Sequence, residues 1–250
     1  RPTVDLFVAQ DRAETLFQLQ SEGQYVLATQ AKSFAEADSA TNKFAGSTVL
    51  DVANRMASEY NAFALPELTL IDEHVQLGRT VYFQDNQLIG YFNREQSRGY
   101  LAAVYTIRNG VMVLDIPDIG TISLKLENTS SKITADIVDD VPHFQIEVSC
   151  KAYISEINQD LRKKLSLDVY EKFETALNEK LKLQIESAVE QAVIRDSTDI
   201  FNFDVALQQQ QTEYWKVHRD SWAQELAKIK YTVNVTSSVD RVQQEASPAF

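Results

Sequence analysis

Three histidines, one cysteine and one pair of adjacent aspartates are the side chains best suited to chemistry in this sequence. His74, His143 and His218 are scattered, and none has another metal-ligand type at helical or hairpin spacing. A metal site would need long-range convergence, because a bound ion takes several ligands at once. The pattern favours ordinary surface or core histidines, so we predict no metal site.

Cys150 is the single cysteine, which excludes an internal disulfide and a multi-thiolate zinc site. It could instead be a nucleophile. Its place in the alternating segment 144–154 puts it on the inward side, in phase with Val148 and Ala152. Burial in apolar surroundings raises the pKa of a thiol and makes it inert, so we expect a structural cysteine.

Two charged motifs have a chemical and an ordinary interpretation. Asp139 and Asp140 could form a carboxylate pair for acid–base catalysis or cation binding, but their place before Pro142 favours a solvated turn. The run Arg162 to Lys164 could contact an anion or a lipid, but nearby acidic residues favour a solvated face. Known catalytic motifs are absent from the sequence. We therefore predict no enzyme, no catalytic residue and no cofactor.

Composition narrows the function classes further. The chain has 250 residues, of which 44% are hydrophobic and 24% charged, and its net charge is -12. This is the composition of a folded globular protein. The negative charge repels phosphate backbones and anionic lipid headgroups, so neither nucleic-acid binding nor electrostatic membrane binding is expected. No run approaches the roughly 18–20 apolar residues that span a bilayer.

The elements that must position these residues are short in the first third. We predict a strand at Val4–Ala9 and a helix capped by Asp11. Ser47 or Thr48 could cap a second helix with one apolar face. That face would contain Val49, Val52, Met56 and Tyr60. Pro66 is expected to end this region before an extended segment.

The middle third predicts an antiparallel sheet. Segments 80–84 and 87–92 flank Asp85-Asn86, a two-residue connection that favours a tight hairpin. A further strand is predicted at 111–116. Three segments then alternate between apolar and polar residues: 122–127, 133–137 and 144–154. Alternation of this kind indicates strands with one buried and one solvated face.

The last third predicts helices and a closing strand. Apolar residues recur every three or four positions from Tyr170 to Ala192, which indicates an amphipathic helix of about seven turns. A closing strand is expected at 231–236. The predicted fold class is α+β, with antiparallel sheets and with the long helix and a second, Trp-bearing helix packed on one face.

Two tryptophans define the second helix. Trp215 and Trp222 are seven residues apart and therefore share one helical face. They could form an exposed anchor for a partner, because Trp is enriched at binding hot spots. They could instead lock the helix onto the sheet. The apolar stripe continues through Leu226 and Ile229, which favours packing.

Four short motifs in a fixed order carry a family resemblance. They are Thr80–Phe92, Glu95–Leu101, Asp199–Phe203 and Tyr214–Trp222. Their order and spacing resemble the Ger(x)C family, the C subunits of the nutrient germinant receptors of bacterial spores. The resemblance spans nearly the whole chain and is strongest from Arg79 to Val235. Eight motif residues become candidates for structural or partner-contact roles: Phe83, Leu88, Gly90, Gly99, Asp199, Phe201, Trp215 and Trp222.

The chain also departs from the family pattern. The family often has glycines where Asn202 and Asp204 stand, and its usual Arg-x-Gly near Arg241 is absent. The family's lipid-carrying cysteine is missing as well, so the resemblance implies a fragment lacking roughly the first third of the full protein. It divides the chain into a truncated N-terminal α/β region, a C-terminal α+β region and a frayed tail. These are residues 1–76, 77–245 (or two sub-domains, 77–118 and 119–245) and 246–250.

The resemblance implies a non-enzymatic lipoprotein subunit that supports germination by assembling with the A and B membrane subunits of a receptor. Diacylglycerol on the missing N-terminal cysteine would tether it to the outer face of the spore inner membrane, as its sole membrane contact. The alternative is an extracytoplasmic module that binds a small nutrient molecule. A hydrolase has almost no residue support. A binding module should show a concave pocket with convergent polar groups. An assembly component should show a broad apolar or mixed surface patch without one.

Overall fold

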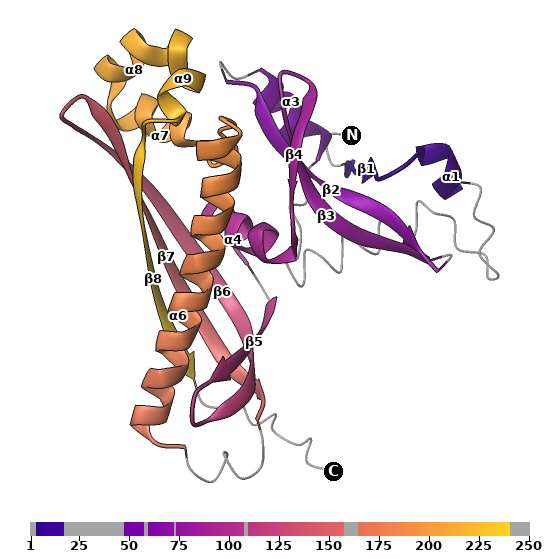
Figure 1. Ribbon diagram of the computed structural model, residues 1–250, viewed down its shortest axis with the longest axis vertical. Coiled ribbons are helices and arrows are strands. Elements are labelled where there is room, and N and C mark those ends of the chain that lie inside the picture. Colours follow the sequence, from indigo (N-terminus) through magenta and orange to yellow (C-terminus); the bar gives the residue numbers. More distant parts are fainter. Residues whose placement is uncertain are drawn as a thin grey trace.

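Two four-stranded sheets lie side by side, and a long helix runs along the second (Figure 1). The computed structural model describes residues 4–17, 48–57, 60–72, 74–107, 110–157 and 165–240. The basic run at 162–164 and the predicted tail lie outside these residues. The predicted α+β class is confirmed, although each sheet contains one parallel pair of strands that alternation alone did not reveal.

The first sheet has the strand order β1-β2-β3-β4. Its strands are β1 (Val8–Ala9), β2 (Ala62–Ile71), β3 (His74–Gln84) and β4 (Gln87–Phe92). β3 and β4 form the predicted hairpin, and both turn residues, Asp85 and Asn86, have positive φ. This left-handed geometry matches the twist of the flanking strands, which is why a two-residue turn suffices.

Two predictions for this region were wrong in extent. β1 covers only two of the six residues predicted at Val4–Ala9, because only Val8 and Ala9 find partners on β2. Pro66 does not end the region but lies inside β2, next to a bulge between Pro66 and Leu68. A bulge tolerates proline because the ladder is already interrupted there. The boundary expected between residues 76 and 77 falls within β3.

Helix α3 (Val49–Met56) begins at Thr48, which forms a capping box with Asp51. The predicted apolar face is wrong in part, because Val49 and Met56 are exposed and Val52 is the one buried residue of the helix. α3 therefore packs on the first sheet through a narrow contact. A helix follows Asp11 as predicted, but α1 (Ala13–Phe17) begins two residues after it, so Asp11 stands one position before the N-cap.

The second sheet has the order β5-β6-β7-β8. Its strands are β5 (Gly110–Ile116), β6 (Gly120–Val138), β7 (Val141–Glu156) and β8 (Lys230–Asp240). The segments predicted as two strands, 122–127 and 133–137, belong to β6 and are separated by a bulge between Leu126 and Asn128. β8 pairs with β7 in parallel. A parallel neighbour needs a long crossover, and the helices after β7 provide it.

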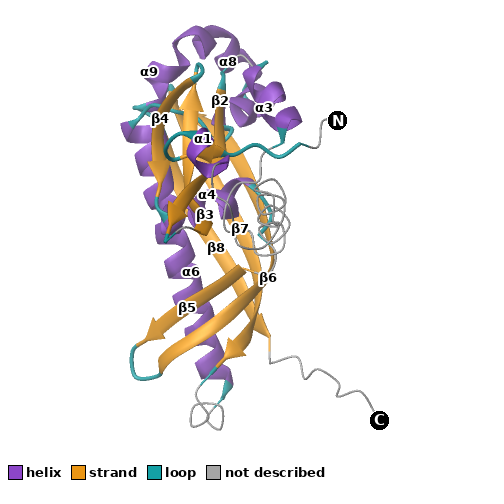
Figure 2. Ribbon diagram, turned by 90° about the vertical axis from the view of Figure 1, so that its right-hand side faces the viewer, coloured by secondary structure: helices purple, strands orange, loops and turns teal. Residues whose placement is uncertain are grey.

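Helix α6 (Leu167–Val189) covers one side of the second sheet (Figure 2) and continues as a π-helical turn, Glu190–Arg195. The predicted helix from Tyr170 to Ala192 is confirmed over nearly all of its length. Its inward stripe is fully buried: Phe173, Leu177, Leu181 and Ile185. The alternating residues of β6 and β7 face this stripe, and together they form the main core.

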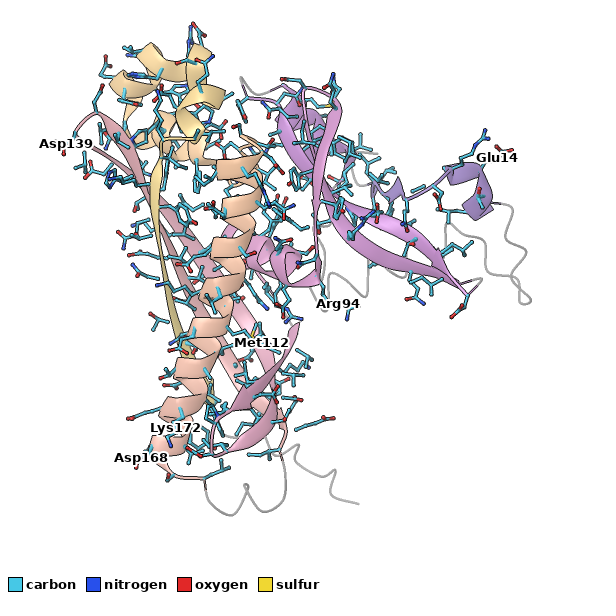
Figure 3. All side chains as sticks on the ribbon, in the orientation of Figure 1. Glu14, Arg94, Met112, Asp139, Asp168 and Lys172 are labelled. Carbon is cyan, nitrogen blue, oxygen red and sulfur yellow. The ribbon has the colours of Figure 1, made fainter. Side chains whose placement is uncertain are left out.

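Four shorter helices complete the fold. They are α4 (Arg94–Val104), α7 (Phe203–Gln210), α8 (Thr212–His218) and α9 (Trp222–Leu226). The predicted Trp-bearing helix is thus two helices, separated by a 3₁₀ turn at Arg219–Ser221. α7, α8 and α9 gather at one end of the molecule, near the tip of the β6–β7 hairpin at Asp139 (Figure 3).

Gly99 sets the distance between α4 and α6. A Cβ at this position would overlap the backbone of Gln184 in α6. Only glycine allows two helices to approach this closely. α4 also contacts β3 of the first sheet and β6 of the second, so its position against α6 fixes how the two sheets meet.

We predict that Gly99→Ala destabilises the protein by about 1–3 kcal/mol through overpacking. The sign of this change in the free energy of unfolding distinguishes a close contact from free space, because Gly→Ala inside a helix otherwise stabilises by roughly 0.5–1 kcal/mol. Thermal or urea unfolding measures the difference, with exposed Arg94→Ala in the same helix as the control. A Gly99→Ala protein as stable as the parent would show that the helices do not need this close approach.

Candidate functional site

The molecule has two halves: the first sheet with α1 and α3, and the second sheet with α6 and the helices that follow it. They meet at residues 196–202, which we call the junction loop. Three hydrogen bonds tie it to the first sheet. The Tyr60 hydroxyl donates to the Ser197 carbonyl at 2.7 Å, and the Thr198 hydroxyl donates to the Gln84 side chain at 3.1 Å. The Tyr82 hydroxyl donates to the Asp196 carboxylate. Because the junction loop follows α6 directly, these bonds connect the long helix to the first sheet.

Asp199 organises the other side of the junction loop. Its carboxylate is 1% exposed and accepts hydrogen bonds from Phe203 N at 3.0 Å, Asp204 N at 2.7 Å and Trp222 Nε1 at 3.2 Å. The N-cap residue of α7, Asn202, is left-handed and makes no side-chain cap. Asp199 therefore caps α7 in its place and also holds α9.

The tryptophans pack inside the molecule. Trp215 and Trp222 are both buried, with ring centroids 5.6 Å apart in an edge-to-face arrangement. Phe144 of β7 stacks on Phe203 at 4.3 Å. Phe201 meets Tyr100 of α4 edge-on at 5.4 Å. The packing interpretation of the tryptophans is confirmed. Aromatic rings also join α7 and α9 to β7 of the second sheet.

Asp204 places a second carboxyl beside Asp199. Burial raises the pKa of Asp199, and burial together with the Asp199 charge raises the pKa of Asp204 to about 8. Arg55 of α3 opposes both shifts with its positive charge. Asp199 accepts three hydrogen bonds as a carboxylate, whereas Asp204 Oδ1 has no partner within the described residues. The two carboxyl groups are therefore coupled, and burial opposes the ionisation of both.

We predict that Asp204→Asn flattens the dependence of stability on pH. The folded pKa of about 8 lies above the ordinary value of 3.8, so Asp204 costs nothing below about pH 4. Stability is lost as the pH rises from about 4 to about 8, because over this range the unfolded chain releases the Asp204 proton while the folded chain keeps it. An amide cannot ionise and escapes this loss.

The measurement is the free energy of unfolding at about pH 5 and about pH 9. Asp204→Asn should lose less stability than the parent between these values, by a few kcal/mol. Asp220→Asn is the matched control, since that side chain is almost fully exposed. Parallel pH profiles for all three proteins would contradict a buried, protonated Asp204.

We also predict that Trp222→Ala costs about 3–5 kcal/mol of stability, through lost burial and the cavity that remains. The substitution also removes a donor from Asp199. Thermal unfolding checks this, with exposed Val217→Ala of α8 as the control. An unchanged melting temperature would mean that Trp222 contributes little to the core.

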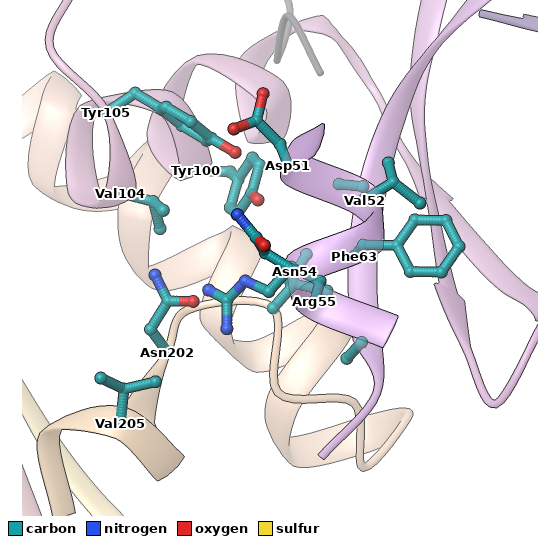
Figure 4. A pocket seen from close by; sticks show the side chains of 13 residues that line it. Asp51, Val52, Asn54, Arg55, Phe63, Tyr100, Val104, Tyr105, Asn202 and Val205 are labelled. Atoms are coloured by element: carbon teal, nitrogen blue, oxygen red, sulfur yellow. The ribbon is translucent and has the colours of Figure 1, made fainter. Parts of the chain in front are cut away.

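A cavity of about 430 Å³ opens between α3, β2, α4 and the junction loop. Its polar walls are formed by six side chains: Asp51, Asn54, Arg55, Tyr100, Tyr105 and Asn202. Figure 4 shows the side chains of Arg55, from α3, and Asn202, from the junction loop, pointing toward one another. A second hollow of about 530 Å³ is lined by Tyr60 and Gln84, which bind the junction loop, together with Asp85 and Arg219.

An exposed apolar surface lies on the first sheet. Phe63, Phe83 and Leu88 are successive partners across β2, β3 and β4, and therefore share one face. The rings of Phe63 and Phe83 stack at 5.2 Å, while Leu88 is 58% exposed. Tyr91, also exposed, lies under the Arg79 guanidinium at 3.9 Å. We call Phe63, Phe83, Leu88 and Tyr91 the β4 patch.

The structure therefore separates the eight motif residues into three groups. Asp199, Phe201, Trp215 and Trp222 meet around the junction loop. Gly90 and Gly99 lie at close approaches, to the Tyr82 ring and to α6. Phe83 and Leu88 lie on the β4 patch. Motifs far apart in the sequence thus share the junction, whereas Phe83 and Leu88 face outward.

The sequence analysis did not name Arg55 or Tyr100 as candidates, and it wrongly placed Tyr60 on the face of a helix that ends at Met56. All three contribute to the junction or its cavity. A signal for Arg55 was present. Thr48 and Asp51 stand at capping-box spacing, and Arg55 follows Asp51 by four residues, which places both on one face of the helix. Tyr60 and Tyr100 gave no comparable signal.

The other candidate residues have ordinary surroundings. Cys150 is buried, and burial raises its pKa to about 12, as its phase predicted. Asp139 and Asp140 form the exposed turn between β6 and β7, also as predicted. His218 stacks on Tyr214 at 3.9 Å.

His143 is half-buried in β7, and the side chain of His74 lies outside the described residues. Within the described part of the chain, no three His, Cys, Asp or Glu side chains are grouped as a metal site. No helix there is long and apolar enough to cross a membrane.

Comparison with protein families gives a clear match. Residues 78–243 match the model of the family described as spore germination B3/GerAC like, C-terminal. The chain belongs to this family. The resemblance inferred from the four motifs is thereby confirmed, and the matched region contains all eight motif residues. No curated protein matches the chain at a significant level.

One solved structure shares the fold of this family member. The crystal structure of the GerBC protein superposes with a TM-score of 0.72 at 14% sequence identity. The match covers 96% of this chain and 69% of that chain. At this identity the likeness shows the fold, which includes both sheets and the helices between them.

Proposed function

We propose that this chain is the body of the C subunit of a spore germinant receptor, and that it acts by assembly rather than by catalysis. The family match supports the class of protein, and the GerBC-like fold is consistent with it. In this proposal the full protein carries diacylglycerol on an N-terminal cysteine and is tethered to the outer face of the spore inner membrane. Its partners are the A and B membrane subunits.

The observation that carries the assembly role is the exposure of two family-motif residues. Motif residues in a core are explained by packing, as Asp199 and Trp222 are. Phe83 is half-buried and packs in part against the cluster of Val52, Leu65 and Val81, but Leu88 beside it is 58% exposed, so packing does not explain Leu88. Exposed apolar side chains that gather on one face are typical of protein interfaces. We infer that the β4 patch contacts a membrane subunit.

No metal, nucleic acid or cofactor takes part in this proposal. The net charge of -12 suits a body that is held by a lipid anchor and makes no electrostatic contact with anionic lipids. Among the described residues, no pairing of a nucleophile with a base supports a hydrolase.

We predict that Leu88→Asp abolishes co-purification of the full lipoprotein with the A and B subunits from spore membranes. An exposed substitution should change the free energy of unfolding by only about 0.5 kcal/mol. Loss of binding would then reflect the surface and not the fold. A charge placed in an apolar interface is costly, because it must be desolvated without a partner.

Val217→Asp is the matched control, because Val217 is 76% exposed on α8, outside the β4 patch. It should leave co-purification intact. Full recovery of both membrane subunits with Leu88→Asp would contradict a role of the β4 patch in assembly.

A further inference from the structure

Two arginines in the first turns of α4 have no partner for their charge. Among the described residues, neither Arg94 nor Arg98 makes a hydrogen bond or an ion pair. Other cations of the chain are paired, as Arg79 is with Glu67 at 2.8 Å. The one acidic residue of α4, Glu95, lies close enough to favour the charged form of Arg98 but makes no ion pair with it. We call Arg94 and Arg98 the α4 arginine pair.

The unpaired charge of Arg98 is unfavourable in the free protein. Arg98 is half-buried, and burial lowers the pKa of its guanidinium. The Glu95 charge opposes this shift, whereas the Arg94 charge adds to it. Arg94 and Arg98 share one face of α4, and like charges at this spacing repel. Because arginine stays protonated in proteins, the free chain carries this cost, which folding does not explain.

The α4 arginine pair adjoins the β4 patch. β4 ends at Phe92, so Arg94 follows Tyr91 of the patch by only three residues, just beyond the end of the strand (Figure 3). Leu88 and Arg94 are six residues apart, which is at most about 20 Å. An interface of standard size covers about 800 Å² on each partner and is therefore roughly 30 Å across. One partner can contact both the patch and the arginine pair.

The charge of the whole chain decides which kind of anion fits. An anionic membrane recruits clusters of roughly four to eight basic residues, and nucleic acid is bound through several phosphates at once. Two arginines beside Glu95, on a chain with a net charge of -12, supply neither. A single carboxylate of a protein needs only one guanidinium, whose planar fork it accepts in two hydrogen bonds.

We propose that the α4 arginine pair binds an acidic surface of the membrane subunit that contacts the β4 patch. This inference rests on the proposed function and adds the chemistry of the partner. The partner presents apolar side chains to Leu88 and Tyr91, and carboxylates to Arg94 and Arg98. The rest of this acidic chain repels such a surface, so the arginine pair also fixes the orientation of the partner.

The first test is co-purification of the full lipoprotein with the A and B subunits from spore membranes at about 0.1 M and about 1 M salt, where charges act over roughly 10 Å and 3 Å. Recovery of the membrane subunits with the parent should fall as the salt rises. Arg94→Glu should reduce recovery about 10-fold at low salt, because it places like charges opposite each other. Lys132→Glu, at an exposed position of β6, makes the same change in charge and should assemble as the parent does.

The second test separates a contact from a structural role. Arg98→Gln removes the unpaired charge, so the purified 250-residue chain should melt at the parental temperature or above it. In the full lipoprotein the same substitution should reduce recovery of the membrane subunits at low salt. A lower melting temperature with normal recovery would show that Arg98 supports the fold and would overturn the proposal.

A suppressor screen then identifies the partner residue. Substitutions that restore assembly to Arg94→Glu should replace an aspartate or glutamate of a membrane subunit by a neutral or basic residue. Suppressors confined to apolar positions would contradict an acidic partner. Vesicles of phosphatidylglycerol test the membrane itself, and the purified chain should not sediment with them. Sedimentation that Arg94→Glu abolishes would identify lipid headgroups as the ligand and would overturn the proposal.

The outcomes distinguish this inference from the proposed function. Normal recovery with Arg94→Glu, together with loss of recovery with Leu88→Asp, would overturn the arginine contact and leave assembly through the β4 patch in place. Absence of both membrane subunits from the parent preparation at either salt concentration would instead contradict the proposed function, and this inference with it.

Discussion

The fold depends on one buried carboxylate. Asp199 is isolated from solvent, and its cost of burial is offset by three hydrogen bonds. Two of these begin α7 and the third holds Trp222. The same loop bonds Tyr60 and Gln84 of the first sheet through Ser197 and Thr198. If Asp199 lost its partners, an uncompensated charge would remain in the core, so the junction loop has little freedom to rearrange locally.

This constraint separates the buried junction residues from the β4 patch, although both contain family-motif residues. The junction residues are committed to packing and cannot reach a partner. The β4 patch lies on a two-residue hairpin, where Leu88 is free to contact another protein. The cavity lies where α3 meets the junction loop.

Much of the second half could be predicted from sequence, because its strands alternate regularly and α6 has a continuous apolar stripe. The parallel direction of β8 beside β7 could not be predicted, because a strand with one buried face alternates in the same way in either direction. α4 was missed although Asn93 and Gln96 form a capping box, because Gly99 interrupts a short helix whose first turns have no apolar residue. The junction could not be predicted, since Asp199, Tyr60 and Arg55 meet only through tertiary structure.

Hydrogen exchange of an Asp199→Asn variant tests the central role of this carboxylate most directly. An amide has one oxygen and cannot accept all three hydrogen bonds. Exchange should therefore become faster in α7 and α9, and also in the β3–β4 hairpin, which is bonded to the same loop. Asp220→Asn should exchange as the parent does. Faster exchange confined to the first turn of α7, with the hairpin and α9 unchanged, would show that Asp199 is a local cap and does not join the two halves.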